Sequence, residues 1–289
     1  MPASCSAHEQ PPTIRRADPI VVMPPATRND AELATLPIAL RQNMFSGQTV
    51  LISGAGTGIG KAAAYWFARL GARVAMCGRT AEKLDSTASG LRSLGAEVRS
   101  YPMTIRNPDE VATLFADVWR DFGALHVLVN NAGGQFPQAA IDFSIKGWQA
   151  VIDTNLSGPW YMMQQAARLW QREGQPGSIV NVVVVVSRGM PGVAHSCAAR
   201  AGVIHLAKTL AIEWAPLNIR VNCVAPGIIA TEGMRVYPPE ALAAMPRSNP
   251  MKRFGNVEDV ANAICYLAGD AAAFITGEVL VVDGGWMSR

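Results

Sequence analysis

Four closely spaced glycines, in Gly54-Ala55-Gly56-Thr57-Gly58-Ile59-Gly60, form a loop whose chemistry is phosphate binding. The apolar run Thr49–Ser53 precedes the loop, and an amphipathic segment, Lys61 to Leu70, follows it. A strand, a glycine-rich turn and a helix N-terminus bind a pyrophosphate because free N–H groups and the positive end of the helix dipole face the anion. The alternative is a tight turn without a ligand, but its position after the first of a series of strands favours phosphate binding. We therefore expect a pyrophosphate-containing cofactor to bind here, held by Gly54, Thr57, Gly58, Ile59 and Gly60.

The second strand ends with a basic residue where an NAD-binding protein needs an acidic one. It reads Met76-Cys77-Gly78-Arg79-Thr80, with no acid before Glu82. An acid would accept a hydrogen bond from the ribose 2′-hydroxyl, whereas Arg79 would pair with a 2′-phosphate. The alternative is that Arg79 is an ordinary solvated side chain at a helix start. We favour NADP(H) as the cofactor.

The scaffold that must position these groups is predicted to be α/β. Short β-branched runs predict strands over 49–53, 73–77, 97–102, 126–130, 178–186, 220–224 and 278–282. Helical patterns alternate with them, over 58–70, 81–94, 108–122, 145–156, 160–172, 195–214 and 257–267. Strands separated by helices form parallel βαβ units. We therefore expect a Rossmann-type doubly wound seven-stranded parallel sheet with helices on both faces, built as a single domain over residues 47–289.

Composition excludes several other classes of protein. The 289 residues are 49% hydrophobic and 16% charged with a net charge of +3, which argues against disorder and against nucleic acid as the main partner. The longest apolar stretches are far shorter than the ~20 residues of a membrane helix, so we expect no membrane partner. The five cysteines are an odd number without a CxxC pair, so we expect no metal site and a reducing, cytoplasmic location.

Residues 1–46 differ from the rest of the chain. They contain no glycine but hold seven of the nineteen prolines, and their acidic and basic residues cancel. The segment lacks the apolar core of a signal peptide, and its acids argue against a mitochondrial transit peptide. We expect a Pro-rich N-terminal arm, helical over Asp30–Gln42, that lies on the surface or on a partner subunit; a misassigned start codon is the alternative.

Further motifs give the chain a family resemblance. Asn130-Asn131-Ala132-Gly133 ends the fourth strand, Asn155 lies in a predicted helix, and Arg220–Gly227 and Ile275–Gly285 complete the pattern. From Gly47 to Gly285 the chain resembles the short-chain dehydrogenase/reductases. More narrowly, stretches such as NNAGGQF and HSCAARAGV are similar to the trans-2-enoyl-CoA and 2,4-dienoyl-CoA reductase branch.

The resemblance implies a nicotinamide cofactor across the C-terminal edge of the sheet. Asn131, Ala132 and Gly133 would then line its adenosine and ribose side, and Pro226, Gly227 and Thr231 its carboxamide end. An Asp that closes the third strand in much of the family is replaced here by the stretch containing Thr104, so a hydroxyl or a backbone group would contact the adenine.

The catalytic set of the family is largely missing. Of the usual Asn, Ser, Tyr and Lys, only the Asn remains, as Asn155. Arg200 occupies the position of the family lysine and Ser196 that of the tyrosine. The position of the family serine falls within Val182–Val185 and is therefore a valine. We expect Asn155 to give positional support, Ser196 to bind a substrate oxygen and Arg200 to bind the nicotinamide ribose. Each has a structural alternative: Asn155 could be an amide that bridges helix and backbone, Ser196 a hydroxyl at a helix N-terminus, and Arg200 a surface cation.

This replacement favours one reaction over another. Reducing a ketone needs a proton donor of matched pKa, and neither serine nor arginine is one. Hydride addition to a C=C bond conjugated to a thioester creates an enolate, which needs hydrogen-bond donors at the oxygen while water protonates the carbon. Serine, asparagine and arginine can all donate.

We therefore expect NADPH-dependent reduction of enoyl-CoA thioesters (trans-2-enoyl or 2,4-dienoyl), in fatty acid metabolism. A 3-oxoacyl or carbonyl reductase with an atypical site and a catalytically silent NADP-binding protein are the alternatives. The long segment Ile228–Pro250 reads as a lid. Apolar residues and cations in and after it, including Arg247, Lys252 and Arg253, suit an acyl-CoA partner, with solvated charges as the alternative. The family also implies a homo-oligomer, a dimer or tetramer.

Overall fold

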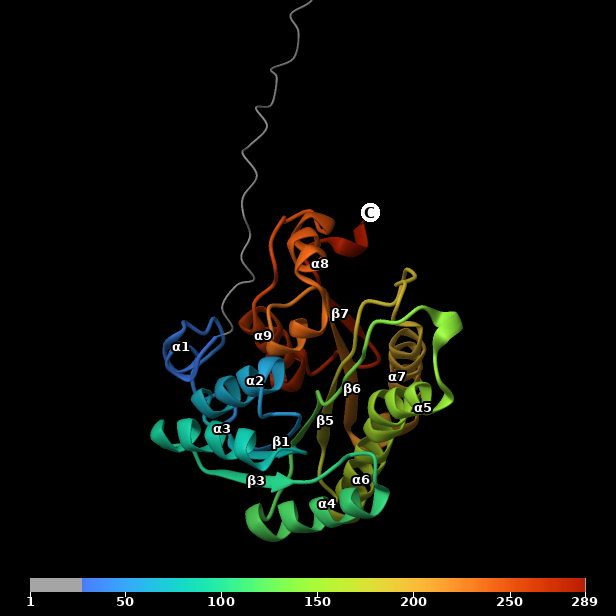
Figure 1. Ribbon diagram of the computed structural model, residues 1–289. Helices are drawn as coiled ribbons and strands as arrows, with labels where there is room; N and C mark the ends of the chain where they lie inside the picture. The colour runs from blue at the N-terminus through green and yellow to red at the C-terminus, as the bar shows by residue number, and fades with distance from the viewer. Residues whose placement is uncertain (1–27, 289) are drawn as a thin grey trace, which may run out of the picture.

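The computed structural model describes residues 28–288 of the chain (Figure 1). The Pro-rich stretch of the expected arm therefore lies outside the described residues. Its remaining part, residues 28–46, leads directly into the first strand.

Seven parallel strands form the central sheet, in the order β3-β2-β1-β4-β5-β6-β7. The strands are β1 (Thr49–Ser53), β2 (Arg73–Gly78), β3 (Val98–Pro102), β4 (Val127–Asn130), β5 (Gly177–Val182), β6 (Ile219–Pro226) and β7 (Val279–Val282). β1, β4 and β5 are buried along their whole length, as strands covered on both faces must be. The order reverses between β1 and β4, which creates a crevice at the carboxyl ends of the strands.

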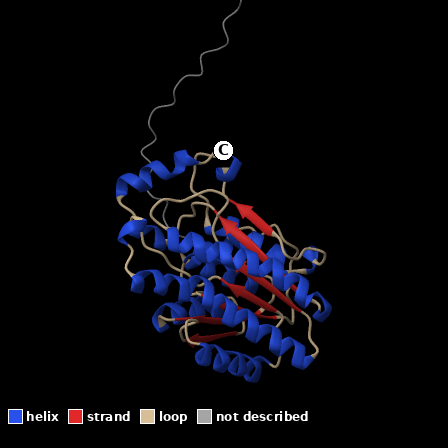
Figure 2. Ribbon diagram, turned by 90° about the vertical axis from the view of Figure 1, so that its right-hand side faces the viewer, coloured by secondary structure: helices blue, strands red, loops and turns tan. Residues whose placement is uncertain are grey.

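Helices cover both faces of this sheet (Figures 1 and 2). One apolar core lies under α2 (Gly58–Arg69), α3 (Ala81–Ser93) and α9 (Val257–Ala268). The other lies under α4 (Pro108–Phe122), α6 (Gly158–Glu173) and α7 (Ala194–Trp214), with α5 (Ile145–Ile152) packed beside α7. The fold class expected from the sequence is confirmed. Among residues 28–288, no helix is long and apolar enough to cross a membrane.

The expected strand over 178–186 is too long by four residues. β5 pairs with β6 from Gly177 to Val182, and the last ladder bond runs from the Val183 N–H to the Val224 carbonyl. The next ladder bond would need an N–H from Pro226, the last residue of β6, so the four valines Val183–Val186 leave the sheet as a loop toward α7. Valine content alone cannot mark the end of a strand, because the pairing partner decides it.

The helix expected over Asp30–Gln42 is also shorter, since α1 spans only Asp30–Thr35. Pro37 explains its end, because the residue before a proline is pushed out of the helical region. Leu33 and Phe45 are fully buried in the core under α2 and α9. The segment is therefore packed onto the domain rather than extended away from it.

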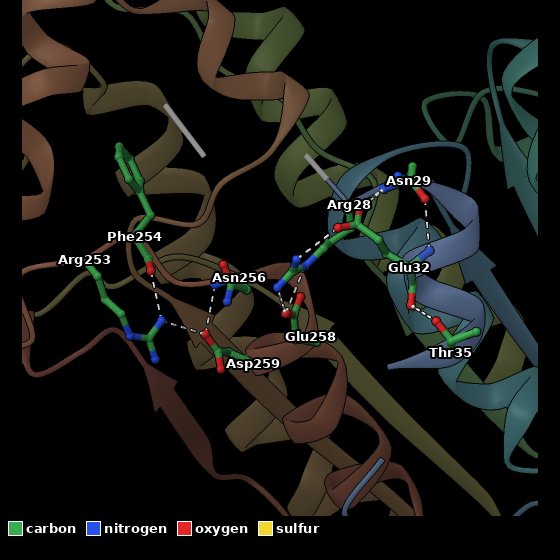
Figure 3. Close-up of polar contacts among 9 residues, drawn as sticks. All are labelled: Arg28, Asn29, Glu32, Thr35, Arg253, Phe254, Asn256, Glu258 and Asp259. Carbon is green, nitrogen blue, oxygen red and sulfur yellow. Dashed lines mark hydrogen bonds and ion pairs between the residues drawn. The ribbon is translucent and has the colours of Figure 1, made fainter. Parts of the chain in front are cut away.

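Two ion pairs fix the start of α1 to neighbouring helices, and Figure 3 shows the one between Arg28 and Glu258. Arg28 donates to the Glu258 carboxylate on the first turn of α9, at 2.8 and 3.1 Å, and Asp30 pairs with Lys61 on α2. On the same turn of α9, Asp259 completes a capping box with Asn256. The first turn of α9 thus anchors both the N-terminal segment and the end of the long segment that precedes it.

The segment between β6 and α9 has its two ends held together and forms short helices between them. Ile229 forms a bridge with Gly255, so the two ends lie side by side. Between them the chain forms short turns and α8 (Pro239–Ala244), which Figure 1 shows above the carboxyl end of the sheet. We call residues 228–254 the lid segment.

Candidate functional site

The glycine loop is built for close backbone approach at the end of β1. Gly54 and Gly58 have φ of +69° and +54°, in the left-handed region that favours glycine. A Cβ on Gly60 would lie 2.3 Å from both the Asn131 amide nitrogen and the Gly54 carbonyl oxygen. The Ser53 hydroxyl accepts hydrogen bonds from the backbone N–H groups of Asn131 and Ala132, at 3.1 and 3.0 Å. These contacts join the loop to the end of β4.

The N-terminus of α2 fits a pyrophosphate. Thr57 is the N-cap, but within the described chain no side chain caps the helix, and its first turn holds no acid. The backbone N–H groups of Gly58, Ile59 and Gly60 are therefore not occupied by a carboxylate. Thr231 of the lid segment lies over the loop, since a Cβ on Gly58 would meet its methyl carbon at 3.3 Å. A phosphate group would thus sit between helix and lid.

Arg79 and Thr104 lie at the ends of neighbouring strands. Arg79 is exposed directly after β2 and forms no ion pair with any acid in residues 28–288. After β3, the Thr104 N–H donates to the Glu110 carboxylate at 2.9 Å, and the Thr104 hydroxyl accepts from the Arg106 N–H at 3.4 Å. The free cation fits a 2′-phosphate, whereas the Thr104 backbone is already engaged.

Asn155 lies in a π-helical turn, Asp153–Ser157, that joins α5 to α6. Its amide donates to the Gly134 carbonyl at 2.8 Å and accepts from the Gly134 N–H at 3.0 Å. The same amide nitrogen lies 3.4 Å from the Ser196 hydroxyl. The sequence predicts an uninterrupted α-helix over 145–156, whereas the structure ends α5 at Ile152 and continues as the π turn. A π turn inserts an extra residue into a helix and is common at functional sites. Asn155 bridges this turn to the loop after β4 and contacts Ser196 as well.

Arg200 is buried, so it is not a surface cation. Only 6% of it is exposed, and its guanidinium donates to the Val182 carbonyl at 2.7 Å. A Cβ on Gly133 would lie 1.9 Å from its Nη2, so any side chain there would displace the guanidinium. Burial lowers the pKa of Arg200 to about 10, which leaves it cationic at neutral pH. Its Nε is buried and has no acceptor in the described part of the chain. The orphaned donor fits a site that awaits hydroxyl or carbonyl oxygens.

Ser196 lies in the first turn of α7 but does not cap it, because the N-cap is Val193. Ser196 is almost fully buried, and its N–H donates to His195 Nδ1 at 2.8 Å. The His195 ring packs against Phe136 and Phe143, with centroids at 4.7 and 4.4 Å. Burial lowers the pKa of His195, so the ring is neutral at pH 7. The neutral imidazole holds the backbone of Ser196 and leaves its hydroxyl facing Asn155.

Stability is expected to fall as the pH drops from about 7 to about 5, in part because of His195. The unfolded chain binds a proton at the ordinary histidine pKa, whereas the folded chain resists protonation until a lower pH. Burial lowers the pKa of His126 in the same direction, so both side chains contribute. Thermal midpoints of His195→Gln should depend less steeply on pH than those of the wild type. His205→Gln, at an exposed position, should match the wild type; an unchanged slope in His195→Gln would contradict the assignment.

The remaining expected positions lie at the end of β6. Pro226 is the last residue of the strand, and Gly227 faces Asp283 so closely that a Cβ would lie 2.7 Å from its Cα. Among the described residues, no group of His, Cys, Asp and Glu could hold a metal ion.

The sequence did not point to one contact at the mouth of the site. Gln135, beside Gly134, donates from its amide to the Tyr237 hydroxyl of the lid segment at 2.8 Å. This contact brings the phenol of Tyr237 to the rim of the site. Tyr65 and Tyr101, by contrast, lie on α2 and β3. The only sequence signal was the presence of Tyr237 in a long segment between elements.

Comparison with known proteins bears on this geometry. The family model described as Enoyl-(Acyl carrier protein) reductase matches residues 54–287. A probable 2,4-dienoyl-CoA reductase [(2E)-enoyl-CoA-producing] of Bacillus subtilis is 36% identical over 247 residues, covering 83% of this chain and 97% of its own. The 3-oxoacyl-[acyl-carrier-protein] reductase FabG of Thermotoga maritima is 38% identical over 242 residues, covering 83% and 98%.

Solved structures give the same result for the fold. The citronellol catabolism dehydrogenase AtuB of Pseudomonas aeruginosa PAO1 superposes with a TM-score of 0.77 at 38% identity, over 86% of this chain and 98% of its own. A short-chain type dehydrogenase/reductase of Mycobacterium marinum gives 0.81 at 32% identity, over 90% and 100%.

Proposed function

The chain is an oxidoreductase of the short-chain dehydrogenase/reductase family, which binds a nicotinamide cofactor and small-molecule substrates, and we propose that it reduces the conjugated C=C bond of enoyl-CoA thioesters with NADPH. The observation that carries the proposal is the buried trio Asn155, Ser196 and Arg200, which offers hydrogen-bond donors and a fixed cation but no acid of suitable pKa. Both trans-2-enoyl and 2,4-dienoyl thioesters fit this chemistry.

The cofactor would be held by groups along the sheet edge. The amides at the start of α2 would bind its pyrophosphate, Arg79 its 2′-phosphate, and Arg200 its nicotinamide ribose. Asn131 to Gly133 would line the adenosine and ribose side, and Pro226, Gly227 and Thr231 the carboxamide. When bound, NADPH supplies the hydride that adds to the β or δ carbon.

The trio then stabilises the charge that moves to the thioester oxygen. The Ser196 oxygen lies within reach of the Asn155 amide nitrogen as an acceptor, so its O–H can donate to the substrate. Arg200 adds a positive charge in a buried, poorly solvated place, where such charge acts strongly. Asn155 also fixes Gly134, which keeps the loop after β4 in place. Water can protonate the carbon, so that step needs no acidic side chain from the trio.

A second candidate is 3-oxoacyl reduction, which the 38% identity to the Thermotoga maritima reductase favours. That reaction would need an acid for the alkoxide, and the position of the family tyrosine holds Ser196. A homo-oligomer, dimer or tetramer, and a place in fatty acid metabolism belong to the same proposal.

The proposal is tested by NADPH oxidation with crotonyl-CoA, hexadienoyl-CoA and acetoacetyl-CoA. We expect turnover of one or both of the unsaturated thioesters. Turnover of acetoacetyl-CoA alone would overturn the proposal in favour of the ketone reductase.

The choice of NADPH is tested separately with Arg79→Asp. A charge-assisted contact to the 2′-phosphate is worth about 1.5–3 kcal/mol, so kcat/KM for NADPH should fall roughly 30-fold. The value for NADH should stay the same or rise, because an acid can accept from the 2′-hydroxyl. Arg92→Ala, on the far end of α3, serves as the control. Equal losses with both cofactors would contradict the assignment.

A further inference from the structure

The rim of the site carries a cation stacked on an indole. Arg188 lies in the loop that leaves β5, and its guanidinium carbon is 4.2 Å from the centre of the Trp286 ring, after β7. The neighbouring Ser187 hydroxyl contacts the Met287 sulfur at 2.6 Å. Two segments about a hundred residues apart in sequence thus meet here. The loop that presents Arg188 continues into α7, which carries Ser196.

The C-terminal side of this contact is held in place. Both oxygens of the Asp283 carboxylate accept backbone N–H groups, from Gly285 at 2.8 Å and Met287 at 2.7 Å. The carboxylate is therefore engaged and forms no ion pair with Arg188. The indole Nε1 of Trp286 is buried and has no acceptor in residues 28–288. The Trp286 ring is only partly buried, so part of it remains accessible to a ligand, whereas its N–H is not.

The end of the lid segment brings two more cations to the same rim. Gly284 accepts from the Met251 N–H at 3.3 Å, and Gly285 packs on Pro250. The adjacent Lys252 is exposed and bonded to the Arg247 carbonyl at 2.8 Å.

These cations differ from Arg253, which the sequence places in the same set. Arg253 pairs with Asp259 on α9 (Figure 3). Arg188, Arg247 and Lys252 form no ion pair with any acid of the described chain. The rim therefore keeps positive charge around an aromatic ring.

We propose that Arg188 and Trp286, with Arg247 and Lys252, bind the adenosine 3′,5′-bisphosphate end of coenzyme A. This inference rests on the proposed function. Guanidinium and indole faces stack on purine rings, and unpaired cations bind phosphate oxygens. An acidic carrier protein would also be attracted by the charge, but the phosphopantetheine arm of a carrier protein has no purine ring to stack on Trp286. The nucleotide is therefore the ligand that uses both features.

The test compares thioesters with and without the nucleotide. With crotonyl-CoA, Arg188→Ala should raise KM about tenfold and change kcat less than twofold, because the contact is remote from the reacting atoms. With crotonyl-N-acetylcysteamine, which lacks the nucleotide, KM should be unchanged. Arg188→Lys, which keeps the charge, and Trp286→Leu should each show part of the effect. Arg99→Ala, an exposed arginine on β3 at the opposite edge of the sheet, is the matched control.

A binding measurement separates this inference from the proposed function. Adenosine 3′,5′-bisphosphate should bind the wild type by calorimetry at saturating NADP⁺, and Arg188→Ala should bind it at least about tenfold more weakly. If it binds but no thioester is reduced, the rim site stands and the proposed function falls. If N-acetylcysteamine thioesters are reduced but the bisphosphate does not bind, the rim site is wrong. One further outcome would also overturn the rim site. In it, the wild type prefers a carrier-protein thioester and does not bind the bisphosphate, and Arg188→Ala loses that preference.

Discussion

Arg200→Met is expected to lower kcat/KM for crotonyl-CoA by at least about 100-fold, the usual loss when one group that stabilises an oxyanion is removed. The methionine fills a similar volume but removes the only buried cation of the trio and its bond to the Val182 carbonyl. The unpaired carbonyl costs about 1–3 kcal/mol of folding stability, so the protein should remain folded in an ordinary stability range. The measurement is steady-state kinetics together with the thermal midpoint.

Two further variants make this result specific. Arg200→Lys keeps the charge and should retain more activity than Arg200→Met. Tyr237→Phe removes the rim phenol, which hydrogen-bonds to Gln135, and should keep kcat within about threefold of the wild type if that phenol takes no part in the chemistry. A fully active Arg200→Met would show that the buried cation is unnecessary.

The double variant Ser196→Tyr with Arg200→Lys is expected to gain ketone reduction. It rebuilds the spacing Tyr-x-x-x-Lys at the two positions that the family resemblance assigns to those residues. A positioned general acid contributes about 100- to 10,000-fold, so turnover of acetoacetyl-CoA should rise by at least tenfold even in an imperfectly packed site. Asn155 remains to support the new phenol.

The single variants serve as controls for the pair. Ser196→Tyr alone places a phenol beside a cation that cannot pass on a proton, and Arg200→Lys alone has no phenol to assist. Neither should reproduce the gain of the pair. If the wild type already reduces acetoacetyl-CoA faster than the folded double variant, the interpretation of Ser196 as a departure from ketone chemistry is wrong.

Local sequence patterns predict most of this fold. Apolar runs such as Val127–Asn130 mark strands buried on both faces, and the glycine loop marks the first crossover. Errors arise where a distant partner decides the outcome. The valines after Val182 leave the sheet because Pro226, on the distant strand β6, has no N–H to extend the ladder. The early end of α1 is instead a local effect of Pro37.

The site shows the same division between local and distant causes. The family resemblance predicts that Asn155, Ser196 and Arg200 act together, and the structure places Asn155 next to Ser196. The contacts between Gln135 and Tyr237, and between Arg188 and Trp286, join segments about a hundred residues apart, and no periodicity announces them. Arg253 shows the reverse case, because a cation that looks free in the sequence is paired with Asp259.

The pH dependence of kcat/KM for crotonyl-CoA tests most directly whether charge is stabilised here without an acidic phenol. Serine and asparagine do not titrate between pH about 7 and about 9, and burial leaves the pKa of Arg200 at about 10, so the profile should be flat over that range. A fall with an apparent pKa inside the range, abolished in Tyr237→Phe, would contradict the account and make the rim tyrosine the acid.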